Sequence, residues 1–340
     1  MIKASLTALH DKFIDAKEAT LDWLGRRGFV GKATVGGLVA LVIAYAAVLV
    51  FEYHIDDDPM IGIAPQHEVQ NGSRAIAMAA TLMDMEASHW APNKPWFFPI
   101  SHSTNMIAYQ RGIQYAVAQF VTQMADFLGR ERGSGEADKN LVAAKGLLNY
   151  DPTAFILPSA VSQYREGIRN LDDYNRRLAT GQAKYDKIAG NLSDLLVRIG
   201  KDLGSQSGTI ELTVLSPDDF TEAEKAKLTD NQRSVLESNG GYFDGRATGV
   251  FFATKGRMYA YYMILTAIGA DFGDVLAVKG AQEHWQNMLV SLRSGATLYK
   301  FFVANGAGGS YCIPSDLAYQ GFFLLRFDKQ LQELADILNR

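Results

Sequence analysis

The sequence predicts a mainly α-helical protein, in which an N-terminal transmembrane helix precedes an extracytoplasmic helical bundle with one long coiled-coil-like helix, about 158–204. Three observations predict this class. Residues 33–51 form one apolar run without a charge. Apolar residues recur at three- and four-residue spacing through most of the remaining chain. The 340 residues are 48% hydrophobic and 21% charged, a composition that excludes a disordered or collagen-like protein.

Residues 33–51 are expected to cross a membrane, because about 20 helical residues span a hydrocarbon core about 30 Å thick. A cleaved signal peptide is disfavoured, since its apolar segment usually has ~7–15 residues and ends at small residues, whereas this run ends in Val50-Phe51-Glu52. Basic residues precede the run and acidic residues follow it: Arg26, Arg27 and Lys32 against Glu52, Asp56, Asp57 and Asp58. The positive-inside rule therefore predicts a cytoplasmic N-terminus and a lipid bilayer as partner of 33–51.

This topology divides the chain into a cytoplasmic tail (1–32), the transmembrane helix (33–51) and an extracytoplasmic domain (52–340). In a bacterium with two membranes the span lies in the inner membrane and the large domain in the periplasm. The tail is expected to be either an amphipathic helix on the inner leaflet or a short helix that contacts nothing. The apolar stretch 258–270 is too short for a second span and is predicted to be a core helix.

Helical spacing predicts helices over about 73–89 and 104–130. The segment between them contains prolines at positions 92, 95 and 99, which exclude regular helix. Residues 129–140 are predicted to form an exposed loop. The stretch 250–276 is the most apolar helical material outside the proposed span, so it is expected to be buried.

The strongest pattern lies between Val161 and Leu203, where core positions alternate three and four residues apart as in a coiled coil. Asn175 and Gln182 occupy polar core positions in this pattern and are predicted to set its register. Leucines in 324–338 repeat the spacing. We favour an intramolecular antiparallel pair with this C-terminal stretch over a homodimer, and the oligomeric state stays open.

Shorter elements follow from local signals. Residues 209–215 alternate enough to predict a strand. Thr221 and Glu224 have the spacing of a capping box that begins a helix. Residues 239–245 and 305–310 are rich in glycine and are predicted to be a turn and a loop.

Composition limits the partners and the chemistry. The formal net charge is −4 and no Lys/Arg-rich block is present, so a nucleic-acid partner is not expected. The single cysteine, Cys312, is expected to be a small buried hydrophobe. Ser310 and Cys312 lie in no recognisable nucleophile motif.

No metal, cofactor or catalytic residue is predicted. Glu86 and His89 form one ExxH pair, but a carboxylate-bridged metal pair in a helical bundle needs a second copy. The run 56–58 lacks the glycine turn and the distal glutamate of a calcium loop, so these carboxylates are expected to be solvated. The loop 305–310 lacks the lysine and hydroxyl residue of a phosphate-binding loop.

Four aromatic residues gather in the proline-rich segment: Trp90, Trp96, Phe97 and Phe98. They are candidates for contact with a partner or ligand, because aromatic rings offer large contact area at low entropy cost. The alternative, which we favour, is that this loop closes one end of the helical core.

Several segments in order resemble the bacterial family known as domain of unknown function 2333: SHWAPNKPWFFP, YQRGIQYAVAQF, ADFLGRERGSG, QYREGIRNLDDYNRRLATG and GVFFATKGRMYAYYMIL. The resemblance covers most of the chain beyond the apolar run. It implies a single-pass inner-membrane protein of Gram-negative bacteria with a helical extracytoplasmic domain. It brings no catalytic residues.

The sequence therefore favours a membrane-anchored periplasmic scaffold or interaction protein of the cell envelope, with other envelope or membrane proteins as partners. The first alternative is an envelope enzyme that acts on peptidoglycan or lipid. A sensor that signals to a cytosolic partner is a third hypothesis, which the short tail disfavours.

Overall fold

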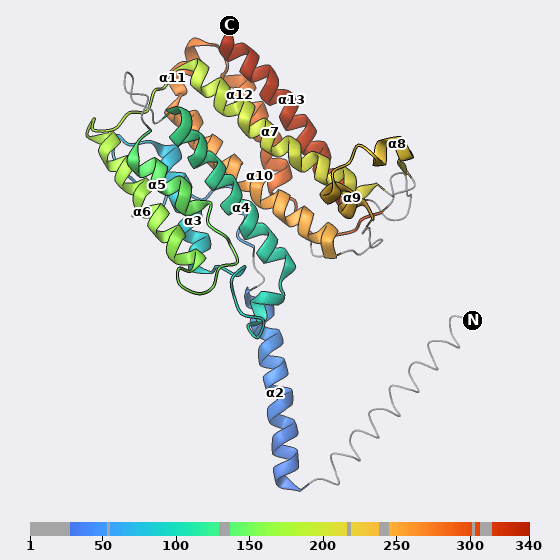
Figure 1. Ribbon diagram of the computed structural model, residues 1–340. Coiled ribbons are helices and arrows are strands. Elements are labelled where there is room, and N and C mark those ends of the chain that lie inside the picture. The colour runs from blue at the N-terminus through green and yellow to red at the C-terminus, as the bar shows by residue number, and fades with distance from the viewer. Residues whose placement is uncertain are drawn as a thin grey trace. The chain divides into compact units, whose positions relative to one another are not determined.

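The computed structural model describes residues 28–52, 55–128, 137–215, 219–237, 245–300, 303–306 and 315–340. Every regular element in these ranges is helical, so the mainly α fold is confirmed (Figure 1). The chain divides into two compact units, Met1–Tyr53 and His54–Arg340.

The first unit contains helix α2, Phe29–Glu52, which includes the whole apolar run 33–51. Most of its described apolar side chains, such as Leu41 and Ile43, are exposed. Within the described residues, which omit several side chains of α2, no helix is both long and apolar enough to cross a membrane. The predicted tail helix falls on residues outside the described ranges.

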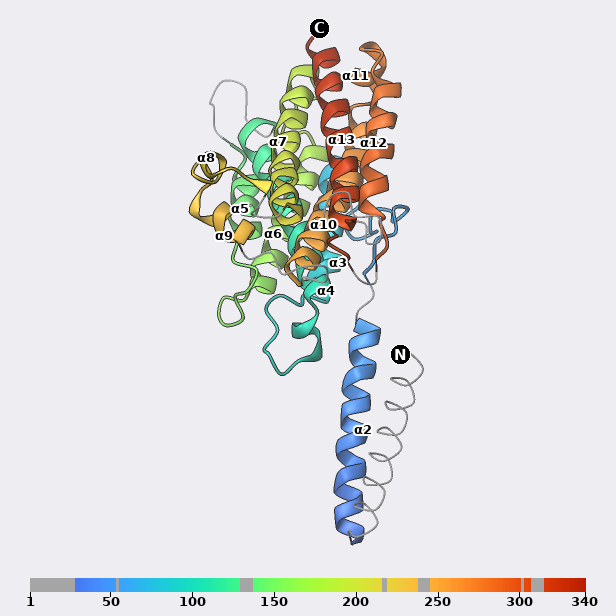
Figure 2. The same ribbon diagram turned by 90° about the vertical axis from the view of Figure 1, so that its right-hand side faces the viewer.

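The second unit is a helical bundle (Figure 1 and Figure 2). Its helices are α3 (Arg74–Ser88), α4 (Thr104–Gln123), α5 (Lys139–Leu148), α6 (Ala160–Ala179), α7 (Ala189–Val214), α8 (Glu222–Lys225), α9 (Asp230–Glu237), α10 (Gly245–Asp271), α11 (Gly273–Val278), α12 (Gln282–Ala296) and α13 (Asp316–Asn339). A 3₁₀ turn, η1 (Pro99–His102), precedes α4, and a π-helical turn, η2 (Met124–Leu128), extends it. The helices predicted over 73–89 and 104–130 correspond to α3 and to α4 with η2.

Helix α10 is the centre of the bundle, because it packs against α3, α4, α7, α12 and α13. The stretch 258–270 lies within it, and Ile264 and Leu265 are completely buried. The prediction that 258–270 forms a core helix is therefore confirmed.

Helices α4 and α10 approach so closely that their backbones touch at two glycines. A Cβ atom on Gly112 would lie 2.2 Å from the carbonyl oxygen of Ala253, and one on Gly256 would lie 2.2 Å from the carbonyl oxygen of Tyr109. Backbone atoms cannot move aside as a flexible side chain can. Only glycine therefore fits at these two positions.

The prediction of one long coiled-coil-like helix over 158–204 is wrong. Helix α6 ends at Ala179 and α7 begins at Ala189. Gly181 has a φ of 75°, and the amide N–H of Gln182 donates to the carbonyl of Arg177 at 2.8 Å, as in a Schellman motif that ends a helix. The heptad-like spacing exists because α6 and α7 each bury one face, α6 against α3 and α5, and α7 against α13.

The intramolecular antiparallel pairing with the C-terminal stretch is confirmed for α7. The Ser193 hydroxyl donates to the carbonyl of Ala335 at 3.3 Å near one end of the pair, and Ile210 lies beside Gly321 near the other. The strand predicted over 209–215 is wrong, because residues up to Val214 continue α7. Their alternation arises from a helix that is apolar on more than one side.

Helix starts agree with the local signals. Ser73 is the N-cap of α3 and accepts a hydrogen bond from the amide of Ile76. The capping box of Thr221 and Glu224 forms at the start of α8, with both reciprocal hydrogen bonds present. The predicted turn at 239–245 and most of the loops 129–140 and 305–310 lie outside the described residues.

Gly112→Ala is expected to lower the free energy of unfolding by about 1–3 kcal/mol, because the added methyl group forces two packed backbones apart. The matched control is Gly146→Ala in α5, where nothing lies within 4 Å of the added Cβ. This control is expected to be neutral or to stabilise by up to about 1 kcal/mol. Urea denaturation of the full chain measures both changes, and equal stability of the two variants would contradict the close packing of α4 and α10.

Candidate interaction surface

Six exposed apolar side chains on two neighbouring loops form the apolar loop surface: Trp96, Phe97, Phe98, Phe155, Ile156 and Leu157. One loop joins α3 to α4 and the other joins α5 to α6. Figure 1 and Figure 2 place the α3–α4 loop at the end of the second unit opposite the C-terminus, and the α5–α6 loop points toward that same end. Exposed clusters of large apolar side chains mark sites of interaction with proteins, ligands or membranes.

Buried polar contacts hold the two loops together from beneath. The indole N–H of Trp90 donates to the carbonyl of Pro152 at 3.0 Å, and the side-chain amide of Asn93 donates to the carbonyl of Ala154 at 3.1 Å. Trp90 also packs edge-on against Tyr164, with ring centroids 5.1 Å apart. These contacts fix one loop against the other.

Successive turns hold the exposed aromatic residues in place. The amide of Phe98 donates to the carbonyl of Pro95 at 2.9 Å, and the hydroxyl of Ser101 donates to the carbonyl of Phe98 at 2.6 Å. The rings of Phe97 and Phe98 lie against each other with centroids 4.9 Å apart. The loop therefore presents its aromatic side chains from a hydrogen-bonded backbone.

The four aromatic candidates divide into one buried and three exposed side chains. Trp90 is 1% exposed and closes the core, whereas Trp96 is 80% exposed. Phe97 and Phe98 are exposed as well. Closure of the core thus describes Trp90, and contact with a partner or ligand stays a prediction for the other three. Spacing alone could not separate them, because no helical or strand period runs through the prolines of this segment.

The two segments that carry the apolar loop surface contain few acidic residues. No aspartate or glutamate occurs in 87–125 or in 152–165, although residues 52–340 carry 33 acidic and 27 basic residues. Lys94 is exposed, and its ammonium nitrogen lies 5.8 Å from the centre of the Phe98 ring. These two segments are therefore less acidic than residues 52–340 as a whole, although exposed Asp151 precedes the second of them.

The acidic run 56–58 attaches the chain to α4 and α10. The phenol of Tyr109 donates to the carbonyl of Asp56, and that of Tyr259 to the carbonyl of Asp58, both at 2.9 Å. The carboxylate of Asp57 pairs with the buried ammonium of Lys255 at 2.6 Å. The expectation that all three carboxylates are solvated is thus wrong for Asp57, which meets a cation from the core.

Glu86 and His89 lie in different environments. Glu86 is partly buried and His89 is exposed. Burial raises the pKa of the Glu86 carboxyl to about 7, with a smaller contribution from the charge of Asp56 and against a hydrogen bond with Gln110. Among the described residues no group of three or more histidine, cysteine, aspartate or glutamate side chains is arranged to hold a metal ion.

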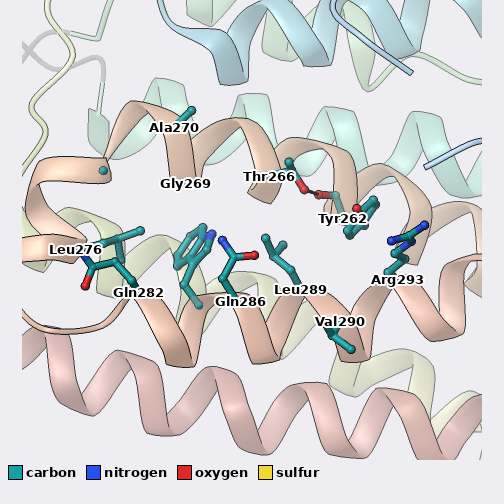
Figure 3. Close-up of a pocket in the computed structure, with 12 residues that line it drawn as sticks. Tyr262, Thr266, Gly269, Ala270, Leu276, Gln282, Gln286, Leu289, Val290 and Arg293 are labelled. Atoms are coloured by element: carbon teal, nitrogen blue, oxygen red, sulfur yellow. Dashed lines mark hydrogen bonds between the residues drawn. The ribbon is translucent and has the colours of Figure 1, made fainter. Parts of the chain in front are cut away.

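Among the pockets of the second unit, two lie beside α10. A cavity of about 390 Å³ lies between α10 and α12 (Figure 3), with Gly269 and Ala270 on one side and Gln286 and Leu289 on the other. The buried indole N–H of Trp285, which also lines it, has no hydrogen-bond acceptor within the described residues. A cleft of about 680 Å³ beside α4 and α10 is lined by residues that include Arg111, Tyr115, Tyr150 and Arg257. Glu86 lines neither.

The remaining predicted residues lie apart. Asn175 is buried, and its side-chain amide bonds the backbone N–H of Ser73 at 2.7 Å and the carbonyl of Ser73 at 3.1 Å. It therefore fixes α6 to the start of α3 and sets no coiled-coil register. Gln182 is exposed in the turn after α6, so it occupies no core position. Ser310 and Cys312 lie outside the described residues.

One polar cluster escaped the sequence patterns. His67 is buried between two carboxylates, with Nδ1 3.0 Å from Asp172 and Nε2 3.4 Å from Asp84. Burial lowers the pKa of His67, but the hydrogen bonds and charges of Asp172 and Asp84 outweigh it, so the pKa is raised above 6.5. The three residues are far apart in sequence, and nothing in their spacing signals the contact.

A raised histidine pKa means that protonated His67 stabilises the fold below pH 6.5 and that this stabilisation disappears as pH rises through the folded-state pKa. The difference in unfolding free energy between the native chain and His67→Gln is expected to be larger at about pH 5.5 than at about pH 8.5. Both proteins contain Glu86, so the pH dependence of stability that comes from its carboxyl cancels in this difference. The control, His89→Gln, changes an exposed side chain and is expected to have little effect. If the loss of unfolding free energy in His67→Gln were constant or grew with pH, the proposed pairing of protonated His67 with Asp84 and Asp172 would be refuted.

A family model described as "Uncharacterized protein conserved in bacteria (DUF2333)" matches residues 67–339. The match confirms the resemblance carried by the sequence segments. No curated protein and no solved structure matches the chain.

Proposed function

Because the chain belongs to this family of uncharacterised bacterial proteins, we propose its function from its own residues. It is a membrane-anchored interaction protein of the bacterial cell envelope, with its second unit in the periplasm, and it acts by binding. The observation that carries the proposal is the apolar loop surface, in which exposed side chains are held on two hydrogen-bonded loops.

The proposed anchor is the run 33–51. It is long enough to cross a bilayer as a helix, and α2 is helical over Phe29–Glu52. The exposed apolar side chains of α2, such as Leu41 and Ile43, suit a lipid environment. Basic residues before the run and acidic residues after it favour a cytoplasmic N-terminus.

The second candidate is an envelope enzyme that acts on peptidoglycan or lipid. It is favoured by Glu86, because a carboxyl with a pKa of about 7 can serve as a general acid near neutral pH. Burial beside the tyrosines that attach 56–58 also explains this pKa, and neither pocket described above includes Glu86. The interaction function therefore agrees better with the geometry.

Alkaline phosphatase fused after Arg340 is expected to be active and to remain with the membrane fraction after carbonate washing. The double change Leu41→Asp and Ile43→Asp is expected to abolish both properties, because two carboxylates make the run too polar for a bilayer. The matched control, Val278→Asp, places a carboxylate at a site that is 86% exposed in the second unit and should change neither. An alkaline phosphatase fusion of the native chain that is intact but inactive would contradict the proposed topology.

A further inference from the structure

We propose that the apolar loop surface lies in the headgroup layer of the membrane that α2 would span, so that the second unit contacts lipid through the tips of its α3–α4 and α5–α6 loops. The inference rests on the proposed anchoring of 33–51. The proposed function leaves the partner of the apolar loop surface unspecified, and this inference names it as the lipid bilayer.

Chain length is the first argument. Ile55 follows Phe51 by four residues, and an extended residue spans at most about 3.5 Å, so the anchor would hold Ile55 within about 14 Å of the apolar core of the bilayer. The next residues are bound by Tyr109 and Tyr259. The side chain of Gln110, adjacent to Tyr109, donates to the carbonyl of His89 and accepts from the amide of Ala91, at the start of the α3–α4 loop. The anchor would therefore deliver this end of the second unit to the membrane.

The shape of the surface is the second argument. Leu157 is 95% exposed, Trp96 80% and Ile156 76%, so these side chains project from the loop tips into solvent. A protein partner would need pockets that match each projection, whereas a fluid headgroup layer accommodates them without such pockets. The turns at Phe98 and Ser101 and the hydrogen bonds of Trp90 and Asn93 keep the loop tips ordered, which reduces the conformational entropy lost on insertion.

Composition and charge are the third argument. Tryptophan and phenylalanine beside lysine are typical of the interfacial layer, where the rings are buried and the lysine amine reaches the headgroups. Residues 87–125 and 152–165 carry no acidic side chain, so the segments that bear the apolar loop surface bring no carboxylate of their own to anionic lipids, although exposed Asp151 precedes the second segment. The remaining surface of an acidic unit is repelled by the same lipids, so charge and apolar contact favour one orientation.

Spin-label accessibility in nanodiscs that contain phosphatidylglycerol tests the proposal on the full chain. In a Cys312→Ser background, single labels are placed by Phe97→Cys, Ile156→Cys, Leu41→Cys and Val278→Cys. Apolar oxygen reaches labels in lipid, and an aqueous nickel chelate reaches labels in water. The ratio of oxygen to nickel collision rates is expected to be several-fold higher at positions 97 and 156 than at position 278. Val278 is exposed and is the last residue of α11, a helix that lies near the C-terminal end of the unit in Figure 1.

Position 41 separates this inference from the proposed function. A nickel-accessible label at position 41 would overturn the anchor and the lipid contact together. A lipid-exposed label at 41 with nickel-accessible labels at 97 and 156 would overturn the lipid contact alone. Labels at 97 and 156 that neither reagent reaches would also overturn it, because they would be buried in a protein interface. Unchanged thermal unfolding of each labelled chain excludes misfolding as the cause.

Discussion

Helices α4 and α10 pass each other with no room for a side chain at Gly112 or Gly256, and this contact positions the other parts of the second unit. The α3–α4 loop, which ends in η1, leads directly into α4. Helix α10 supplies Lys255 and Tyr259, which bind the segment 56–58. The loop and the attachment point of the preceding chain are therefore neighbours because the two backbones meet.

Long-range polar contacts complete the arrangement. Asp271, the last residue of α10, accepts hydrogen bonds from the Ser73 hydroxyl at 2.6 Å and from the amide of Arg74 at 3.0 Å, so the end of one helix caps the start of another. Asn175 binds the backbone of Ser73, and His67 joins Asp84 to Asp172. Buried polar groups of this kind are costly when unpaired, which makes each contact specific for one packing of α3, α6 and α10.

Single helices could be predicted from the sequence where apolar spacing marked one face, as for α3 and α4, or where a capping box marked the first turn, as for α8. The break between α6 and α7 could not, because Gly181 ends a helix without disturbing the three- and four-residue spacing on either side. Residues 209–215 were misassigned for a related reason: a helix that is apolar on more than one side can imitate strand alternation. The division between buried Trp90 and exposed Trp96 depends on contacts with 150–159, some sixty residues away, which no local pattern encodes.

The central claim is that this protein works through the apolar loop surface and not through chemistry at Glu86. Competitive growth of strains that carry chromosomal variants tests it most directly. The triple change Trp96→Ser, Phe97→Ser and Ile156→Ser is expected to grow as the deletion strain does, and Glu86→Gln as the native strain does, with protein levels matched by immunoblot. Native growth of the triple variant together with failure of Glu86→Gln would contradict the account and favour an enzyme.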